Sequence, residues 1–380
     1  MTASALHVVF AEEDTLFRLM EMGLRRAITP AGEKTLRYFF GPEFSAPLER
    51  LTTMADRLGL PRDIAITFCD DDATLDQALP TADVVVLESA RLPGARVRAC
   101  APRARLIQQF GRAVDNIDIE TADRLAIPVA NLIRLSSLSC TDHITALIFA
   151  LSRRLIDAHQ AVMRQRDPAL PAAFSDAPAR NKFNWSGLRG FRILAHSTVG
   201  FIGMGENSGF VARRLRDMGC RVLYFKRTPL TPAAEAGYGG ITFAPLDELL
   251  AQSDFVSLHL PYNEQTEKFA DAGLFAKMRP GAYIINSSRG GILDEVALHA
   301  ALASGHLGGA ALDVYRHEPI PANSPLLELD NILWTPHISG GEPEYMIVEA
   351  EDVLTNIARA WRGEPPAGLV AGGARWEQPG

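Results

Sequence analysis

Residues 199–215 read VGFIGMGENSGFVARRL. An apolar run ends at Gly203, and apolar residues at helical spacing begin just after Gly205. The first glycine permits a tight turn, and the second lets the backbone approach a pyrophosphate whose charge is met by N–H groups at the helix start. The stretch therefore predicts a strand, a phosphate-binding turn and a helix. The residues predicted to meet the phosphates are Gly203, Gly205, Glu206 and Asn207.

The third position of this turn departs from the glycine pattern. It is Ser208, which is small enough for close helix–strand packing, unless Gly209 relieves the crowding instead. Glycines also serve ordinary turns, so the match alone is weak. The strand before it, the helix after it and the pattern downstream favour dinucleotide binding.

Downstream of residue 197, short apolar or β-branched runs alternate with helical stretches, which is typical of a parallel sheet covered by helices. We predict a Rossmann-type doubly wound α/β domain over residues 141–340. Its predicted strands are residues 198–203, 221–225, 254–258, 282–286, 309–314 and 331–334.

The first 140 residues have mixed signals that predict a smaller α/β unit. Strand-like runs occur at residues 84–87, 106–107 and 127–130. Helical spacing predicts one long helix over residues 141–159 between the domains, and an amphipathic helix over 344–362 that returns to the first domain. Pro- and Ala-rich residues after the first of these helices predict an irregular arm over 167–182.

Size and composition limit the function. A chain of 380 residues with 47% hydrophobic residues is long enough for two cores of ordinary size. A net charge of −7 argues against a nucleic-acid partner, which needs a basic face, and favours small-molecule chemistry. No run approaches the ~18 apolar residues of a membrane span, and four scattered cysteines favour free thiols in a reducing compartment. We therefore expect a cytoplasmic protein.

Three residues after the second predicted strand bear on the cofactor. A site for NAD usually has Asp or Glu there to hold the ribose hydroxyls. This chain has Lys226, Arg227 and Thr228, which suit a 2′-phosphate because cations pair with it and a hydroxyl donates to it. NADP is therefore the preferred cofactor and NAD remains possible. The alternative is a solvated basic turn at a strand end.

Arg289, Glu318 and His337 each follow a predicted strand in the second half of the chain. Ligands of open α/β sheets bind at the carboxyl ends of the strands, so the three can converge. An imidazole is suited to proton transfer near neutral pH, and a carboxylate orients it. An arginine binds a substrate carboxylate and polarises a carbonyl oxygen. The set predicts reduction of a 2-oxoacid by a hydride donor.

Each of the three residues also has an ordinary explanation, as a loop ion pair, a surface carboxylate or a strand-end histidine. Their shared placement after successive strands favours catalysis. Among the other histidines, His259 follows a strand and is a candidate for the cofactor cleft, whereas His143, His299 and His306 are interpreted as helix or turn residues. No G-x-S-x-G elbow supports a serine nucleophile.

At these motifs the chain resembles the D-isomer-specific 2-hydroxyacid dehydrogenase family. The resemblance covers roughly residues 80–370 and includes LIQQFGRAVDNIDIETADRLAIPVAN (106–131), the block from 259 to 298 with INSSRGG, LDVYRHEP, and TPHISGG. It implies that Arg289, Glu318 and His337 are the catalytic Arg, Glu and His, and that Asp313 holds the nicotinamide carboxamide. The other cofactor-binding residues it implies are Pro261, Thr266, Ser287, Ser288 and Gly340.

The resemblance also implies a domain organisation. A flavodoxin-like substrate domain would be formed by residues 1–140 and 341–380, and the family is usually a homodimer built around the nucleotide domain. The substrate carboxylate would meet backbone N–H groups at Arg112 and Ala113. The family usually has small or apolar residues in that loop, whereas this chain reads GRAVDNID. Arg112 either recognises a second acidic group of the substrate or points into solvent.

Other activities share this architecture and stay open. Formate dehydrogenases of this type typically lack the Glu partner of the histidine, so Glu318 disfavours that activity. A phosphite dehydrogenase would use a similar Arg, Glu and His set. A dinucleotide-sensing corepressor is the alternative from another class, because a fold does not fix a function.

Overall fold

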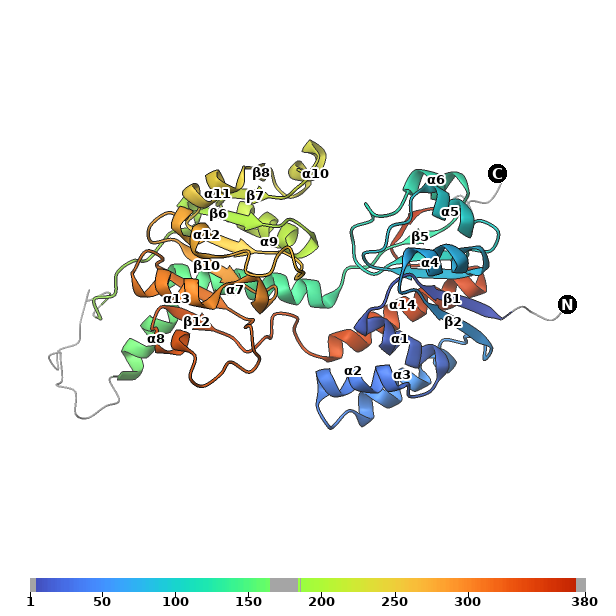
Figure 1. Cartoon of the computed structure of the whole chain (residues 1–380). Helices are drawn as coiled ribbons and strands as arrows, with labels where there is room; N and C mark the ends of the chain where they lie inside the picture. The colour runs from blue at the N-terminus through green and yellow to red at the C-terminus, as the bar shows by residue number, and fades with distance from the viewer. Residues whose placement is uncertain (1–4, 165–183, 185, 374–380) are drawn as a thin grey trace. The chain divides into compact units, whose positions relative to one another are not determined.

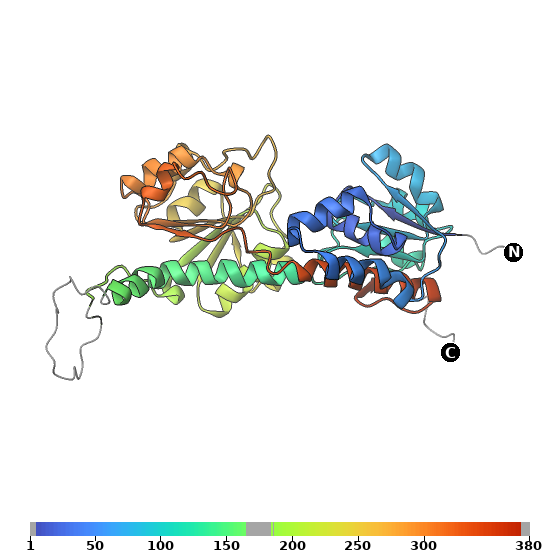
Figure 2. The same ribbon diagram turned by 90° about the horizontal axis from the view of Figure 1, so that it is seen from below.

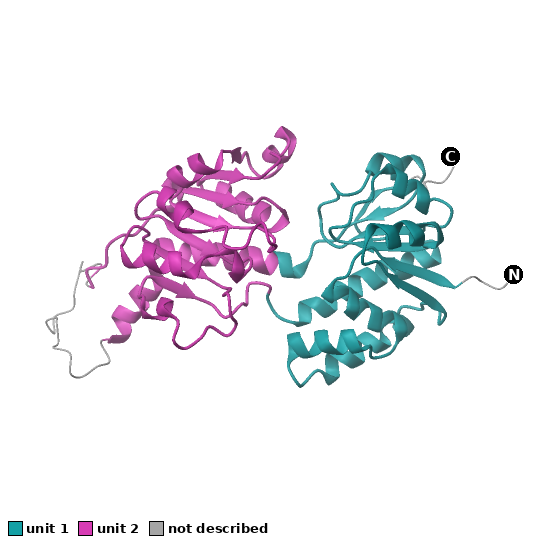
Figure 3. Ribbon diagram, in the orientation of Figure 1, with its two compact units in different colours: residues 1–137, 341–380 teal, residues 138–340 magenta. Residues whose placement is uncertain are grey.

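The computed structural model describes residues 5–164, 184 and 186–373, and its chain divides into two units (Figure 3). Unit 1 comprises Met1–Ser137 and Gly341–Gly380, and unit 2 comprises Leu138–Gly340. The arm predicted over residues 167–182 lies outside the described residues.

Unit 2 contains a parallel sheet with the strand order β12-β11-β10-β9-β6-β7-β8 (Figure 1). Renumbered within the unit, this is 3-2-1-4-5-6 extended by one strand, the order of dinucleotide-binding sheets. The order reverses between β6 and β9, and ligands bind at such a point. The strands are β6 Thr198–Ile202, β7 Arg221–Phe225, β8 Thr242–Phe243, β9 Phe255–Leu258, β10 Tyr283–Asn286, β11 Gly309–Leu312 and β12 Ile332–Trp334.

Helices cover both faces of this sheet, because alternate residues of each strand enter opposite cores. On β6, Ile202 packs with the core formed by α11, α12 and α13, whereas Val199 and Phe201 pack with α7 and α9. Figure 2 shows the green helix α7 lying along this second face. The helices of unit 2 are α8 Leu155–Met163, α9 Glu206–Asp217, α10 Pro232–Gly237, α11 Leu246–Gln252, α12 Ala272–Lys277 and α13 Glu295–Ala303, together with most of α7 Leu135–Arg153.

Unit 1 contains a second sheet, with the order β13-β5-β4-β3-β1-β2. Its parallel strands follow the flavodoxin-like order 2-1-3-4-5, and β13 adds antiparallel to β5. Helix α14 packs with α1 and α3 on one face, and α4, α5 and α6 cover the other. The elements are β1 Leu6–Phe10, α1 Thr15–Arg25, α2 Pro30–Phe40, α3 Ser45–Arg57, β2 Ile64–Phe68, α4 Asp72–Ala78, β3 Val84–Leu87, α5 Gly94–Cys100, β4 Leu106–Gln109, α6 Ile119–Arg124, β5 Val129–Ala130, α14 Glu344–Arg362 and β13 Leu369–Ala371.

Short polar side chains start several of these helices. Asp14 accepts from the N–H of Leu16 at the start of α1, and Asp294 accepts from Val296 and Ala297 at the start of α13. Such caps satisfy N–H groups that have no partner within the helix. They fix where the chain turns from a loop into a helix.

The single helix predicted over residues 141–159 is wrong. The structure has α7 and α8 separated by Arg154, whose φ of 50° lies in the left-handed region. Two contacts with residues 189–192 explain the break. Arg192 donates its N–H to the carbonyl of Ser152 at 2.8 Å, and the Arg154 guanidinium donates to the carbonyl of Arg189 at 2.9 Å. Periodicity within the helix does not reveal contacts made 35–40 residues later.

By length and composition, α7 is apolar enough to cross a membrane, and half of the qualifying window is buried within the protein. Core helices of globular proteins pass the same test, so this finding is weak evidence for a membrane span.

Candidate active site

The turn after β6 has the geometry of a phosphate-binding loop. Gly203 has a φ of 92°, and a Cβ there would lie 2.1 Å from the carbonyl oxygen of His259, so only glycine fits. Gly205 precedes α9, and a Cβ on it would meet nothing within 4 Å. The backbone is therefore bare beside the first-turn N–H groups of Glu206 and Asn207, which is the arrangement that binds anions.

Ser208 and Gly209 together replace the missing third glycine: the first closes the turn and the second allows close packing. Ser208 is buried, and its Oγ accepts from the N–H of Gly205 at 2.8 Å and lies 3.2 Å from the carbonyl of that residue. A Cβ on Gly209 would lie 2.3 Å from the ring of Tyr238. Serine therefore closes the turn, and Gly209 provides the close packing.

Lys226, Arg227 and Thr228 directly follow β7, next to the glycine turn. β6 and β7 pair in parallel up to Ile202 and Phe225, and the N–H of Gly203 donates to the carbonyl of Phe225 at 2.9 Å. Lys226 is half-buried, and the two residues after it are exposed. The structure thus places the three polar residues beyond the strand that adjoins the phosphate turn.

His337 and Glu318 form the central pair of unit 2. The Nδ1 of His337 lies 2.7 Å from Oε2 of Glu318, and each side chain is 35% exposed. The other oxygen of Glu318 accepts from the N–H of Tyr315 at 3.1 Å, which fixes the carboxylate. With Nδ1 engaged, the Nε2 of His337 is left to exchange a proton with a ligand.

Arg289 lies on a turn that a buried asparagine holds. Asn286, the last residue of β10, donates its amide to the carbonyl of Arg289 at 3.0 Å and accepts from the N–H of Ser288 at 3.1 Å. A Cβ on Gly290 would lie 1.9 Å from the carbonyl group of Tyr315, so this turn packs against the backbone that leads to Glu318. The Arg289 side chain is exposed, and its guanidinium donates to the carbonyl of Ser288.

The remaining predicted cofactor residues have different surroundings. Thr266 donates its hydroxyl to the carbonyl of Pro261 at 2.6 Å, so the two close one turn after β9. Ser288 donates its hydroxyl to the carbonyl of Leu258. The Oγ of Ser287 is buried and has no hydrogen-bond partner among the described residues. Gly340 is half-buried at the end of unit 2.

Asp313 is fully buried one residue after β11. It accepts from the Thr335 hydroxyl at 2.6 Å and from the N–H groups of Ile338 and Ser339 at 3.0 Å. Burial by itself raises the pKa of Asp313, but these bonds and a contact with His143 hold that pKa well below its ordinary range. His143 was interpreted from the sequence as an ordinary helix residue, and its ring contact with Thr335 at 3.1 Å was not foreseen.

His259 is a poor acid or base at neutral pH. Burial lowers the pKa of its imidazole to about 4, and its Nε2 lies 2.9 Å from the hydroxyl of Ser257. The ring is therefore neutral near pH 7.

In unit 1, Arg112 and Ala113 are exposed in the loop after β4. The carbonyl of Arg112 accepts from the Asn131 amide at 2.7 Å. Asn116 in the same loop donates to the carbonyls of Glu88 and Ala90 at 3.2 and 2.9 Å, so it joins the loops that follow β3 and β4. Both loops lie at the carboxyl edge of the sheet, where ligands of such sheets bind.

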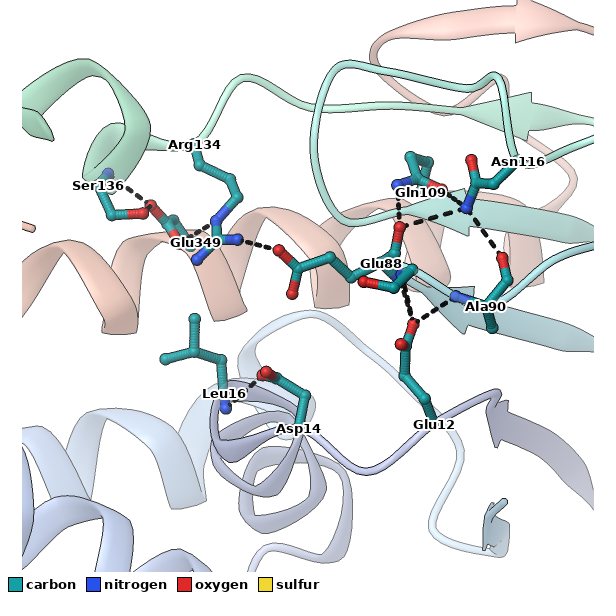
Figure 4. A network of polar contacts seen from close by, with 11 residues as sticks. Glu12, Asp14, Leu16, Glu88, Ala90, Gln109, Asn116, Arg134, Ser136 and Glu349 are labelled. Atoms are coloured by element: carbon teal, nitrogen blue, oxygen red, sulfur yellow. Dashed lines mark hydrogen bonds and ion pairs between the residues drawn. The ribbon is translucent and has the colours of Figure 1, made fainter. Parts of the chain in front are cut away.

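A polar network that was not anticipated from the sequence supports this edge (Figure 4). Oε1 of Glu12, which follows β1, accepts from the N–H groups of Glu88, Ser89 and Ala90 at 2.6, 2.7 and 3.1 Å. One carboxylate thus fixes the path of the loop after β3. Its position shortly after an apolar run was the signal that could have revealed it.

Arg134 connects this loop to α14 within unit 1. Its guanidinium pairs with Glu88 at 2.5 Å and with the buried Glu349 at 3.4 Å (Figure 4). Glu349 also accepts from the N–H and the hydroxyl of Ser136, both at 2.8 Å. Burial raises the pKa of Glu88 to about 7, and Asp14 and Glu12 add to the effect against the opposing charge of Arg134.

Comparison with known proteins identifies the family of the chain. Residues 145–339 match the family model described as "D-isomer specific 2-hydroxyacid dehydrogenase, NAD binding domain". The chain belongs to the D-isomer specific 2-hydroxyacid dehydrogenase family. The resemblance inferred from the INSSRGG, LDVYRHEP and TPHISGG motifs is thereby confirmed, as are the two α/β folds.

Relatives in this dehydrogenase family differ in length. The chain is 34% identical over 305 residues to D-3-phosphoglycerate dehydrogenase of Mycobacterium leprae (strain TN), a match covering 80% of the chain and 54% of the relative. It is 33% identical over 278 residues to glyoxylate reductase of Korarchaeum cryptofilum (strain OPF8), covering 73% and 79%. The chain therefore spans about half the length of the phosphoglycerate dehydrogenases that it matches.

A solved structure of similar fold is the TT0316 protein from Thermus thermophilus, with 25% identity, a TM-score of 0.51 and coverage of 96% of this chain and 100% of that one. Apo D-mandelate dehydrogenase of Rhodotorula graminis, at 21% identity, has a TM-score of 0.55 over 96% of this chain and 97% of the other, and shows the fold alone.

The residues of this family member fit the dinucleotide that its domain is described as binding. Gly205 leaves the backbone bare at the start of α9, and the buried hydroxyl of Ser287 at the carboxyl end of β10 has no hydrogen-bond partner among the described residues. Both features lie at the carboxyl edge of the sheet, as binding to this fold requires.

Proposed function

We propose that the chain interconverts a 2-oxoacid and a D-2-hydroxyacid with NADPH or NADH as the hydride donor. The observation that carries this proposal is the His337–Glu318 pair at 2.7 Å, on loops that follow β12 and β11, with the Arg289 turn packed against the Glu318 loop. When bound, the nicotinamide supplies the hydride for C2 of the substrate.

The protein residues supply the other requirements of this reduction. His337 donates a proton from Nε2 to the carbonyl oxygen, and Glu318 accepts the Nδ1–H and stabilises the imidazolium. Arg289 binds the substrate carboxylate and places positive charge where the oxyanion develops. In the reverse direction, the neutral imidazole takes the proton from the hydroxyl.

We propose that residues 141–340 bind the dinucleotide and that residues 1–140 with 341–380 bind the substrate. Gly203, Gly205, Glu206 and Asn207 would hold the pyrophosphate; Pro261, Thr266, Ser287, Ser288, Asp313 and Gly340 complete the proposed cofactor site. The N–H groups of Arg112 and Ala113 would hold the substrate carboxylate.

NADP is the cofactor that the end of β7 favours. Lys226 and Arg227 carry two positive charges next to the phosphate turn, and no acidic residue stands at these positions to hold ribose hydroxyls. A 2′-phosphate would gain charge-assisted hydrogen bonds there.

We further propose a homodimer. Helix α8 has no buried residue among those described, and Leu155, Ile156 and Val162 on it are 48–56% exposed. An exposed apolar surface of this kind marks an interaction site, and the family resemblance, which implies a homodimer, makes a second copy the partner that we propose for it. Light scattering at several protein concentrations tests this: a monomer mass throughout would contradict it.

A substrate panel tests the proposed activity. The purified protein is mixed with NADPH or NADH and glyoxylate, hydroxypyruvate, pyruvate or larger 2-oxoacids, and the loss of reduced-nicotinamide absorbance is followed. Phosphite with NADP⁺ is the parallel oxidative assay. Turnover of a 2-oxoacid supports the proposal. Turnover of phosphite alone, or tight cofactor binding with no turnover of any substrate, would contradict it and favour the phosphite enzyme or the sensor.

A further inference from the structure

His337 has a backbone conformation that its surroundings must maintain. Its φ of 55° lies in the left-handed region, which residues with a side chain rarely occupy. Such a residue persists at a functional site only where neighbouring contacts determine its geometry. The direction of the imidazole depends on that backbone, so whatever fixes the loop also fixes the ring.

Asp313 holds the loop on both sides of His337. It accepts from the hydroxyl of Thr335, two residues before the histidine, and from the N–H groups of Ile338 and Ser339 directly after it. Asp313 is fully buried, so water does not compete for these bonds. One carboxylate therefore brackets the histidine.

His143 on α7 completes this arrangement from another element. Its Nε2 lies 3.1 Å from the Thr335 hydroxyl oxygen and 3.4 Å from Oδ1 of Asp313. Because the Thr335 hydroxyl donates to Asp313, its oxygen accepts from His143, which sets the tautomer with hydrogen on Nε2. The ring is 16% exposed, which leaves it well packed at this place.

We propose that His143 is a positioning residue for the reaction: by donating to Thr335 and Asp313 it holds the loop that sets the direction of the His337 imidazole. The inference rests on the proposed role of His337 as the acid. It assigns to α7 a part in the site that its sequence pattern, an apolar helix with one histidine, does not suggest. His143 does not exchange protons with the substrate in this scheme.

The activity test compares two substitutions. His143→Phe keeps a planar ring and removes the hydrogen bonds, whereas His143→Gln keeps an N–H near the position of Nε2. We expect His143→Phe to lower kcat by about ten- to a hundredfold, because small misplacements of a catalytic group have effects of this size, with KM and the Kd for NADPH within about twofold. His143→Gln should recover most of kcat. Thr335→Val removes the hydroxyl that accepts from His143. It provides a second variant if His143→Phe does not fold.

A double-mutant cycle separates positioning from general damage. In the His337→Ala background, His143→Phe should have no further effect on kcat, since it acts through the missing ring. An equal loss in both backgrounds, or unchanged kcat in both His143→Phe and Thr335→Val, would overturn the proposal.

A readout independent of turnover keeps this inference distinct from the proposed function. The imidazole carbon signal of His337 is followed by NMR at one pH in the wild type and in both His143 variants. We expect the chemical shift of this signal to change and the mobility of the ring to increase in His143→Phe, and both to return in His143→Gln. If the wild type reduces no 2-oxoacid, the proposed function fails, while the NMR comparison still decides the positioning role; an unchanged His337 signal would refute that role.

Discussion

His337 combines a rarely occupied backbone conformation with a fully oriented ring. The left-handed φ costs about 1–3 kcal/mol, and the hydrogen bonds from Ile338 and Ser339 to Asp313 offset that cost. Glu318 then engages Nδ1 at 2.7 Å. Two carboxylates therefore have separate tasks at this residue. Asp313 holds the backbone of the loop, and Glu318 orients the imidazole ring.

Replacing His337 tests its role as the acid. His337→Ala should lower kcat by ~10²–10⁴-fold, the usual effect of losing a general acid, while NADPH binding stays unchanged. Steady-state kinetics and cofactor fluorescence measure the two. His299→Ala on α13 is the control and should keep normal kinetics. Near-normal turnover of His337→Ala would exclude the assigned role.

Arg112 provides a test of substrate recognition. If its guanidinium reads a second acidic group, Arg112→Ala should lower kcat/KM for dicarboxylic 2-oxoacids about tenfold more than for monocarboxylic ones, because a hydrogen bond to a charged group contributes ~1.5–3 kcal/mol. Arg112→Lys, which keeps the charge, should lose less. Equal losses for both substrate classes would leave Arg112 without this role.

At the scale of elements, the end of β7 and the turn after β6 act together. Their connection through Gly203 and Phe225 fixes Lys226 beside the phosphate turn. The missing third glycine has no structural consequence here, since Ser208 closes the turn and Gly209 makes room for Tyr238.

Exchanging the charge at the end of β7 tests the cofactor assignment. Lys226→Asp should shift the ratio of kcat/KM for NADPH over NADH toward NADH by at least about tenfold, because a charge-assisted bond is lost and a repulsion added. Lys277→Asp on α12 makes the same charge change on the surface and should leave the ratio unchanged. An unchanged ratio in Lys226→Asp would refute the phosphate site.

The loop after β3 predicts a pH effect on stability. Glu88 has a pKa of about 7 in the folded protein against 4.5 for an ordinary glutamate, so the folded chain binds more protons between these values. Its contribution to the free energy of unfolding therefore falls as pH rises from about 4.5 to 7. Glu88→Gln should remove this slope, so its thermal midpoint relative to wild type should be higher at pH 7.5 than at pH 5. Exposed Glu43→Gln is the control, and parallel pH curves for wild type and Glu88→Gln would contradict the expectation.

The strands of unit 2 could be predicted from sequence because central parallel strands are buried on both faces and appear as apolar runs. The same reasoning missed β2, β8 and β13, which lie at sheet edges, are short or carry polar residues. It also missed β1, although this apolar strand is central in the sheet of unit 1. β13 lies after the helix predicted over 344–362, in a segment for which no strand was predicted. It forms because α14 returns the chain to unit 1 beside β5.

For the site, sequence order was informative where residues follow strands, as Arg289, Glu318 and His337 do. It was uninformative for residues that act through distant partners. His143 contacts a loop 192 residues away, and Ser136 and Glu349 are 213 residues apart. Only the folded chain brings such pairs together, so one sequence without the fold does not reveal them.

For the whole molecule, we expect hydride transfer from the nicotinamide to C2 of a 2-oxoacid. The most direct measurement uses NADPH carrying deuterium at both C4 positions and the 2-oxoacid that the panel finds most active. Mass spectrometry and chiral chromatography of the product then show where the label goes. We predict one deuterium at C2 of a D-2-hydroxyacid, and slower formation of this labelled product in His337→Ala by the factor expected for kcat. An unlabelled product, an L-hydroxyacid, or bound cofactor with no labelled product would contradict it.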